Sequence, residues 1–429
     1  MVAYEEIARS KYKSNWLLLL VLASQVLICV FTLFVVYDQF VKEKNLEDVL
    51  EDVIENVNRS VDASQYRMVC YYTTPNSDEK DYLRLVDIKK NLCSHVNIGI
   101  VNVKNSTLIL SSNFIRLLNE ELATLRVTDP SLKILLWVGG GGYAEEGFAS
   151  MVRNHSSRKI FIRSLKEVLH KYKLDGVDLD WEFPRAYNKQ RQHFSQLLRE
   201  IKQEYIRERK DYLLSVAVAA PEGIALFAYD VKELNSYADF VNLMSYDYHF
   251  YTQETPFTGL NAPLYARKNE RSIMGTFNIN YSVNWWLTNG LDRQKLVVGL
   301  PTYGHSFTLV NPFNNKIGAP ASHFGQCGNL GFTTYFETCV FEMKNVIKHF
   351  YDEDTCSPYI NSGAEWISYE NERSLQCKTD YIKSMKLGGA MIFSLNSDDY
   401  KNVCYIIEHN QNTKFPLIEA VKNNLYQKV

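Results

Sequence analysis

Short runs of apolar and β-branched residues recur along the chain from residue 66 to about residue 395. The segments between many of them place apolar residues three and four positions apart, which is the spacing of one buried helix face. The clearest such stripe covers 160–172, after the candidate N-caps Ser156 and Ser157, and a second covers 194–205. The eight apolar runs are 68–73, 95–103, 133–139, 176–183, 213–219, 240–246, 295–300 and 389–395. Eight buried strands alternating with helices over about 360 residues predict an α/β fold, a closed parallel (β/α)8 TIM barrel.

The interval between the seventh and eighth runs is much longer than the others and is rich in turn residues. A structureless loop of that length is uncommon inside a compact domain. We therefore expect a small α+β insertion at about 303–366, within a barrel domain that spans 66–429.

One segment near the N-terminus, 16–36, carries no charge and only three polar residues, Ser24, Gln25 and Thr32. At a rise of about 1.5 Å per residue, a helix of this length spans the hydrocarbon layer of a bilayer. The alternative is a signal peptide cleaved after Ala23, but cleavage there would leave the apolar run 26–36 at a new N-terminus. We expect an uncleaved signal anchor, so that the chain is held in a membrane by one transmembrane helix.

The charges on either side of this segment predict its orientation. Arg9, Lys11 and Lys13 precede it, whereas 38–55 is mixed to acidic. The positive-inside tendency makes 1–15 a cytosolic tail, 37–65 a stalk, and 66–429 an extracellular or luminal domain. If the segment is cleaved instead, the protein is secreted.

Composition agrees with an extracytosolic domain and excludes one class of partner. The chain has 47 basic and 49 acidic residues and no Lys/Arg stripe, so no nucleic-acid partner is expected. Eight cysteines without C-x-x-C pairs or zinc-site spacings favour disulfides. Glycosylation sequons stand at Asn58, Asn105, Asn154 and Asn280.

The candidate chemistry is concentrated in the fourth run. Asp178, Asp180 and Glu182 alternate with apolar residues, so the three carboxyl groups share one strand face, and Glu182 lies near the carboxyl end where barrel active sites occur. Buried carboxylates are costly unless they share protons, accept hydrogen bonds or perform chemistry. A divalent metal is a second interpretation, but no histidine or further acidic cluster stands at matching strand ends, so neither metal nor cofactor is expected.

The same segment resembles a known family. Its pattern, Asp175-x-x-Asp178-x-Asp180-x-Glu182, is similar to the D-x-x-D-x-D-x-E signature of glycoside hydrolase family 18, the chitinases and chitinase-like lectins. The resemblance covers most of the chain after residue 66. Further matching segments are 67–73, 93–95, 240–249, 259–265, 295–304 and 388–393.

The resemblance implies a retaining hydrolysis of β-1,4-linked N-acetylglucosamine in which the substrate's own acetamido group is the nucleophile. Glu182 would be the general acid and base, Asp180 would orient the acetamido group, and Asp178 would share a proton with Asp180. The remaining residues implied at the site are Tyr246, which would bond the acetamido oxygen, and the substrate-binding Asp175, Tyr72, Met244, Asp247, Tyr303 and Phe393. The expected partner is chitin or an oligosaccharide containing N-acetylglucosamine.

The resemblance also implies two disulfides, Cys70–Cys93 and Cys339–Cys404. Cys327, Cys356 and Cys377 are then an odd set, which we interpret as one pair and one free thiol whose connectivity the sequence does not determine.

The chain departs from the family where aromatic side chains commonly bind sugar rings. Phe393, Gly141 and Pro75 stand at positions where tryptophans are usual, and Ile100 replaces a common phenylalanine. Each lost ring contact removes on the order of 1 kcal/mol. An intact acid with fewer aromatic platforms leaves two interpretations, a hydrolase and an oligosaccharide-binding lectin with little turnover; the presence of Glu182 favours the hydrolase.

Overall fold

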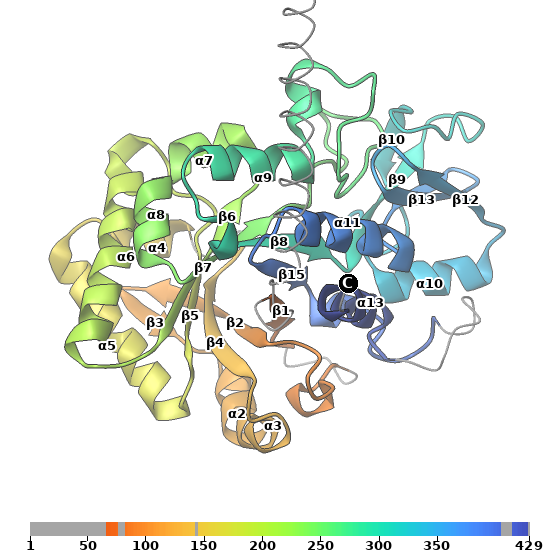
Figure 1. Ribbon diagram of the computed structural model, residues 1–429. Helices are drawn as coiled ribbons and strands as arrows, with labels where there is room; N and C mark the ends of the chain where they lie inside the picture. Colours follow the sequence, from red (N-terminus) through yellow and green to blue (C-terminus); the bar gives the residue numbers. More distant parts are fainter. Residues whose placement is uncertain (1–65, 76–81, 142–144, 405–413, 428–429) are drawn as a thin grey trace, which may run out of the picture. The chain divides into compact units, whose positions relative to one another are not determined.

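The computed structural model describes residues 66–75, 82–141, 145–404 and 414–427 (Figure 1). The predicted tail, transmembrane segment and stalk, 1–65, lie outside these residues. Within the described part of the chain, no helix combines the length and the apolar character needed to cross a membrane.

Eight parallel strands form a closed barrel, which confirms the predicted fold. Each of the eight apolar runs overlaps one of these strands, and pairing of the first strand with both the second and the last closes the sheet. In order around the barrel they are β1 (Arg67–Thr73), β15 (Gly389–Phe393), β8 (Leu296–Pro301), β7 (Phe240–Met244), β6 (Leu213–Ala219), β5 (Gly176–Asp180), β4 (Lys133–Gly139) and β2 (His95–Lys104). A short β3 (Thr107–Ile109) pairs antiparallel with the end of β2.

The strands are almost continuously apolar because they are buried on both faces, between the barrel interior and the surrounding helices. Helices α5, α6 and α8 cover one flank (Figure 1). The helices are α2 (Ser112–Glu120), α3 (Leu122–Thr128), α4 (Glu145–Met151), α5 (His155–Tyr172), α6 (Gln190–Arg207), α7 (Glu222–Ala228), α8 (Val231–Tyr237), α9 (Ile279–Thr288), α11 (Glu372–Ser384) and α13 (Pro416–Tyr426).

The start of α5 differs from the prediction. Its N-cap is Asn154, whose side-chain oxygen accepts a hydrogen bond from the backbone N–H of Ser157, and Ser156 and Ser157 already belong to the first turn. Asparagine is as good a cap as serine, so local spacing alone did not distinguish the three positions.

A second, six-stranded antiparallel sheet lies between β8 and β15 in the sequence. Its elements are β9 (Tyr303–Leu309), β10 (Ala321–Phe324), β11 (Phe332–Thr334), α10 (Tyr335–Lys344), β12 (Lys348–Asp352), β13 (Ser357–Ser362) and β14 (Glu365–Ser368). It has its own small core around Phe307 and Trp366 and lies on the side of the barrel opposite α5 and α6 (Figure 1). Because β9 starts two residues after β8 ends, its first side chains are held beside the carboxyl ends of the barrel strands.

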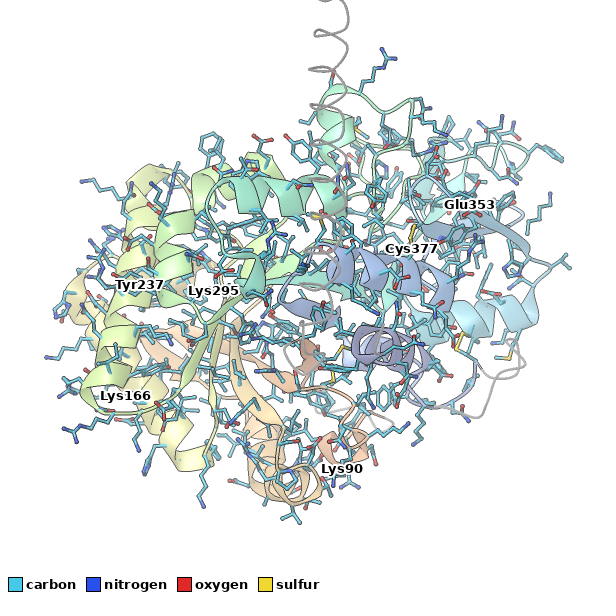
Figure 2. The ribbon with its side chains drawn as sticks, viewed as in Figure 1. Lys90, Lys166, Tyr237, Lys295, Glu353 and Cys377 are labelled. Atoms are coloured by element: carbon cyan, nitrogen blue, oxygen red, sulfur yellow. A yellow bond between two sulfur atoms is a disulfide. The ribbon has the colours of Figure 1, made fainter. Side chains whose placement is uncertain are left out.

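Three disulfides are present in the described residues. The two pairs that the resemblance implies, Cys70–Cys93 and Cys339–Cys404, are bonded. Cys377 of α11, labelled in Figure 2, is bonded to Cys356, and Cys327 is a buried free thiol. The first bond joins β1 to the segment before β2, and the other two tie the inserted region to the C-terminal part of the barrel.

Candidate active site

The acidic side chains of β5 enter the barrel as the alternation predicts. Asp178 and Asp180 are buried in the interior, and Glu182 follows two residues after the strand ends, where it is partly exposed. On the opposite face, Trp181 packs outward, with its ring stacked on Phe148 at 5.5 Å. The carboxyl groups therefore rise in a file toward the mouth of the barrel.

Asp178 lies deepest and is held by donors from three other strands. Tyr71 donates its hydroxyl to Oδ2 at 2.6 Å, and Oδ1 accepts from Ser215 Oγ at 2.5 Å and Asn242 Nδ2 at 2.9 Å. Burial raises the pKa of Asp178, although these hydrogen bonds oppose the rise. Its oxygens thus bind to β1, β6 and β7, and no hydrogen bond joins Asp178 to Asp180 among the described residues.

Asp180 has one oxygen engaged and one without a partner. Trp137 donates from Nε1 to Oδ2 at 2.9 Å, whereas the buried Oδ1 has no hydrogen-bond partner among the described residues. Burial raises the pKa of Asp180 well above its usual value, and the charges of Glu182 and Asp178 add to the rise. A buried carboxyl oxygen left in this way is costly unless a ligand donates to it.

Glu182 has the electrostatic properties of a general acid. Burial, followed by the negative charge of Asp247, raises the pKa of Glu182 from 4.5 to about 7. The loop after β4 leaves space beside it: a Cβ added at Gly141 would lie 3.8 Å from Oε2 of Glu182. A carboxyl group with this pKa is substantially protonated near neutral pH and can transfer its proton.

The segment after β7 brings two more predicted residues to the same place. Tyr246 is buried, and Asp247 is half exposed, with a left-handed backbone (φ +58°) that aspartate tolerates. Asn261 accepts the backbone N–H of Asp247 at 2.9 Å and so fixes this turn. Oδ1 of Asp247 accepts from Tyr303 Oη at 2.6 Å, which joins the barrel to the first residue of the inserted sheet.

Phe393 is the centre of an aromatic cluster at the end of β15. Its ring centroid lies 5.6 Å from that of Tyr71, 5.9 Å from Trp137, 5.7 Å from Tyr246 and 6.1 Å from Tyr303. These five rings come from four strands and from the segment after β7, and they form one apolar lining around the carboxyl groups. Met244, at the end of β7, is partly exposed and packs against the same core.

Two of the predicted site residues lie elsewhere. Asp175 precedes β5 at the opposite end of the strand, where it pairs with Arg126 at 2.6 Å and accepts the N–H of Ile134. Tyr72 points out of the barrel and donates its hydroxyl to the carbonyl of Leu83 at 2.6 Å. The signature spans the whole strand, so its first aspartate is too far from Glu182, and Tyr71 instead of Tyr72 faces Asp178.

The structure also adds residues that the sequence analysis did not select. Tyr71, Ser215 and Asn242 bind Asp178, and His305 lies with Nε2 at 2.7 Å from Oδ1 of Asp247. The sequence did contain a signal for Ser215 and Asn242, because each is the single polar residue inside an apolar strand. Tyr71 had none, since both faces of β1 are apolar.

Comparison with known proteins agrees with this geometry. The sequence profile described as glycosyl hydrolases family 18 matches residues 67–398. The chain belongs to glycoside hydrolase family 18. Within the family it is 32% identical to human chitinase-3-like protein 2 over 373 residues, covering 84% of this chain and 93% of the relative. It is 33% identical to mouse chitotriosidase-1 over 377 residues, covering 84% and 78%.

A solved structure extends the family likeness to three dimensions. Human YKL-39, described as a pseudo-chitinase with retained chitooligosaccharide binding properties, superposes with a TM-score of 0.78 at 31% identity, covering 84% of this chain and all of the other. At similar sequence identity to this chain, family 18 thus includes a protein named as a chitotriosidase and a protein described as a pseudo-chitinase with retained chitooligosaccharide binding.

Proposed function

We propose that this family 18 protein hydrolyses β-1,4-linked N-acetylglucosamine oligosaccharides with retention of configuration. The observation that carries the proposal is Glu182 at the barrel mouth, whose pKa is raised to about 7, beside Asp180, whose Oδ1 has no hydrogen-bond partner among the described residues. An acid that holds its proton near neutral pH and an unpaired acceptor next to it are what substrate-assisted hydrolysis requires.

In this mechanism Glu182 donates its proton to the glycosidic oxygen, and the acetamido carbonyl oxygen of the substrate attacks the anomeric carbon. Oδ1 of Asp180 accepts the acetamido N–H and stabilises the positive charge that develops on nitrogen. Tyr246 donates its hydroxyl to the acetamido oxygen; among the described residues, the partner of this hydroxyl is the weak acceptor Sδ of Met391, at 3.8 Å. Water then opens the oxazolinium ion at the anomeric carbon, and the carboxylate of Glu182 takes its proton.

A second candidate is an oligosaccharide-binding protein with little turnover. It is favoured by the thin aromatic lining, in which Phe393 and Gly141 stand where the family commonly has tryptophan. The relationship to YKL-39, with its reported retained binding, supports the same alternative.

The two candidates are distinguished by release of a fluorophore from chitobiose and chitotriose glycosides, together with calorimetric binding of chitotetraose. The variants are Glu182→Gln, which keeps shape and removes the acid, and Glu120→Gln on the exposed end of α2 as a control. Turnover by wild type and Glu120→Gln that is lost in Glu182→Gln, with binding retained, supports hydrolysis. Equal background in all three proteins, with chitotetraose bound, supports the binding protein and rejects the enzyme.

We also propose that 16–36 anchors the chain as a single-pass membrane protein with the barrel on the extracellular or luminal side. Its apolar character and the basic residues before it support this orientation. Carbonate extraction combined with protease protection tests it: a barrel domain that is released from membranes by carbonate, or digested from the cytosolic side, rejects the proposal.

The same location exposes the sequons to glycosylation. Asn105, in the turn between β2 and β3, and Asn154, the cap of α5, are exposed, and Asn58 lies outside the described residues. Asn280 is half-buried in α9 and accepts a hydrogen bond from Tyr381, so it suits a glycan less well. The assignment is checked by the mass that wild type loses on glycosidase treatment, compared with the mass that Asn105→Gln and Asn154→Gln lose.

A further inference from the structure

A cavity of about 240 Å³ lies between the segment after β7 and the inserted sheet, and none of the four carboxyl groups of the active site lines it. Its walls come from the segment 248–277, from Ile317 and Gly318 before β10, and from Thr355 between β12 and β13. Pockets that hold drug-sized ligands have volumes of about 300–1,000 Å³, so this cavity suits a single ring with small substituents.

Hydrogen bonds join the two walls of the cavity. The N–H of Gly318 donates to the carbonyl of Thr258 at 2.9 Å, and the N–H of Leu264 donates to the carbonyl of Thr355 at 2.8 Å. Within the segment after β7, the ring of His249 lies 4.7 Å from that of Phe257. The fold therefore fixes the shape of the cavity, so that a ligand loses little binding free energy to ordering the protein.

Part of the lining is apolar and still in contact with solvent. Phe277 and Ile317 are partly buried, and Met274 is 37% exposed. A ligand that covers these side chains with its own C–H groups removes apolar surface from water, which favours binding.

The polar part of the lining is the four-residue turn 267–270. The N–H of Glu270 donates to the carbonyl of Arg267 at 2.9 Å, and Oε2 of Glu270 accepts the N–H of Arg267 at 2.9 Å, so the turn is closed twice. Nε of Arg267 lies 3.4 Å from Oδ2 of Asp352, which orients the guanidinium group. Among the described residues, Oε1 of Glu270, the amide of Asn269 and the terminal nitrogens of Arg267 have no hydrogen-bond partner.

The charge and the hydrogen-bonding groups of the lining indicate the class of ligand. Arg267 and Glu270 carry opposite charges, and burial lowers the pKa of His249, so the lining has no net charge near neutral pH. A charged ligand is disfavoured, because an ion of either sign lies beside a like charge. A guanidinium donor, a carboxylate acceptor and an amide that does both match neighbouring hydroxyl groups. A pyranose ring combines such an edge of hydroxyl groups with an apolar C–H face.

We propose that this cavity is a second saccharide site, which binds one neutral pyranose through the turn 267–270 and the apolar side chains of Met274 and Phe277. The inference goes beyond the hydrolysis proposed above and does not depend on it, because the catalytic carboxyl groups lie outside the lining. The sugar bound here is held and not cleaved.

The test is methyl NMR of the full-length protein in detergent micelles, with carbon-13 in the methionine methyl groups and N-acetylglucosamine as the probe. Met274 lines the cavity, whereas Sδ of Met391 lies 3.8 Å from Oη of Tyr246 in the active site, so the two methyl signals report on the two places separately. Met274→Leu and Met391→Leu assign the signals. The Met274 signal shifts and saturates with a Kd on the order of 1 mM, as expected for a ligand that makes few contacts.

Two substitutions in the same turn test the polar contacts. Asn269→Ala removes one of the three groups without a partner from an exposed position, and it raises the Kd at Met274 about threefold to tenfold, the effect of one hydrogen bond. Lys268→Ala is the matched control, because the Lys268 side chain is 88% exposed and pairs with Asp354. This control keeps the Kd within about twofold of wild type.

Several results overturn the proposal. One is a Met274 signal that stays fixed at about a hundred times the expected Kd, and another is an affinity that Asn269→Ala leaves unchanged. Cyclohexanol, a ring with one hydroxyl group, is the probe for a purely apolar site: if it binds as tightly as the sugar, the cavity selects apolar surface alone and the saccharide site is rejected.

Glu182→Gln separates this proposal from the proposed hydrolysis. A Met274 shift that disappears in this variant originates in the active site and overturns the second site. If wild type releases no fluorophore but its Met274 signal saturates with the sugar, hydrolysis is rejected and the second site stands.

Discussion

Replacing Glu182 by glutamine is expected to stabilise the folded protein at alkaline pH, at the same time as it abolishes turnover. The pKa of Glu182 rises from 4.5 to about 7 on folding, a difference of about 2.5 pH units. At about 1.4 kcal/mol per pH unit, the ionised carboxylate costs the native state about 3 kcal/mol. Because the pKa of Glu182 is higher in the folded than in the unfolded protein, the free energy of unfolding is unaffected by this group below pH 4.5. It decreases as the pH rises through 7. Glutamine never ionises, so the Glu182→Gln variant does not lose this stability at alkaline pH.

The assay is the melting temperature of wild type and Glu182→Gln between pH 4 and pH 8.5. For a domain of about 360 residues, an unfolding entropy near 0.75 kcal/mol per degree converts 3 kcal/mol into about 4 °C. We expect equal melting temperatures at pH 4, a difference that grows between pH 4.5 and 7, and a plateau of about 4 °C in favour of the variant above pH 7.5.

The control with opposite sign is Glu204→Gln on α6. Hydrogen bonds from Arg207 and then Lys166 lower the pKa of Glu204 to about 2, so this substitution should reduce the melting temperature at neutral pH (Lys166 is labelled in Figure 2). If Glu182→Gln melts below wild type at pH 8, or if their difference does not change with pH, then Glu182 is not held as a protonated acid and the assignment of its role fails.

Further predictions concern catalysis and binding. Activity, measured as kcat/KM, should fall above about pH 7, because Glu182 must be protonated to act as the acid. Asp180→Asn should lower kcat about 100-fold or more in steady-state assays, since an amide that still accepts from Trp137 turns its NH2 toward the acetamido N–H. Asp175→Asn should lower the melting temperature while kcat stays within about twofold of wild type, because that carboxylate lies at the far end of the strand. Phe393→Trp should strengthen calorimetric binding of chitotetraose by about 1 kcal/mol, roughly fivefold; unchanged affinity would show that residue 393 is not a sugar platform.

The barrel was predictable because its evidence is local. Every strand is an apolar run bounded by polar or turn residues, and the alternation of Asp178, Asp180 and Glu182 with apolar neighbours fixed which face enters the barrel. The error at Asp175 has a geometric reason: the signature covers seven residue steps, about 23 Å of extended chain, so its first and last members lie at opposite ends of β5. The error at Tyr72 arose because both faces of β1 are apolar and alternation carries no information there.

The contact between His305 and Asp247 was beyond such reasoning. The two residues are 58 positions apart, on the inserted sheet and on the loop after β7. Nothing in the local spacing of either segment specifies the other. Only the packing of β9 against the barrel brings the imidazole to the carboxylate.

The electrostatics of the site follow from which donors surround its four carboxyl groups. Asp178, Asp180 and Asp247 receive hydrogen bonds from tyrosine, serine, tryptophan, asparagine and histidine side chains. Within the described residues, no lysine or arginine forms an ion pair with these three groups or with Glu182. Neutral donors orient a carboxylate but compensate its charge less than a cation does, so the repulsion between neighbours persists. An arginine paired with Asp247 would bring a full positive charge next to Glu182 and lower its pKa. Because the donors at this site compensate the negative charges only weakly, ionisation of Glu182 destabilises the folded protein. For the same reason the pKa of Glu182 stays raised, near neutral pH.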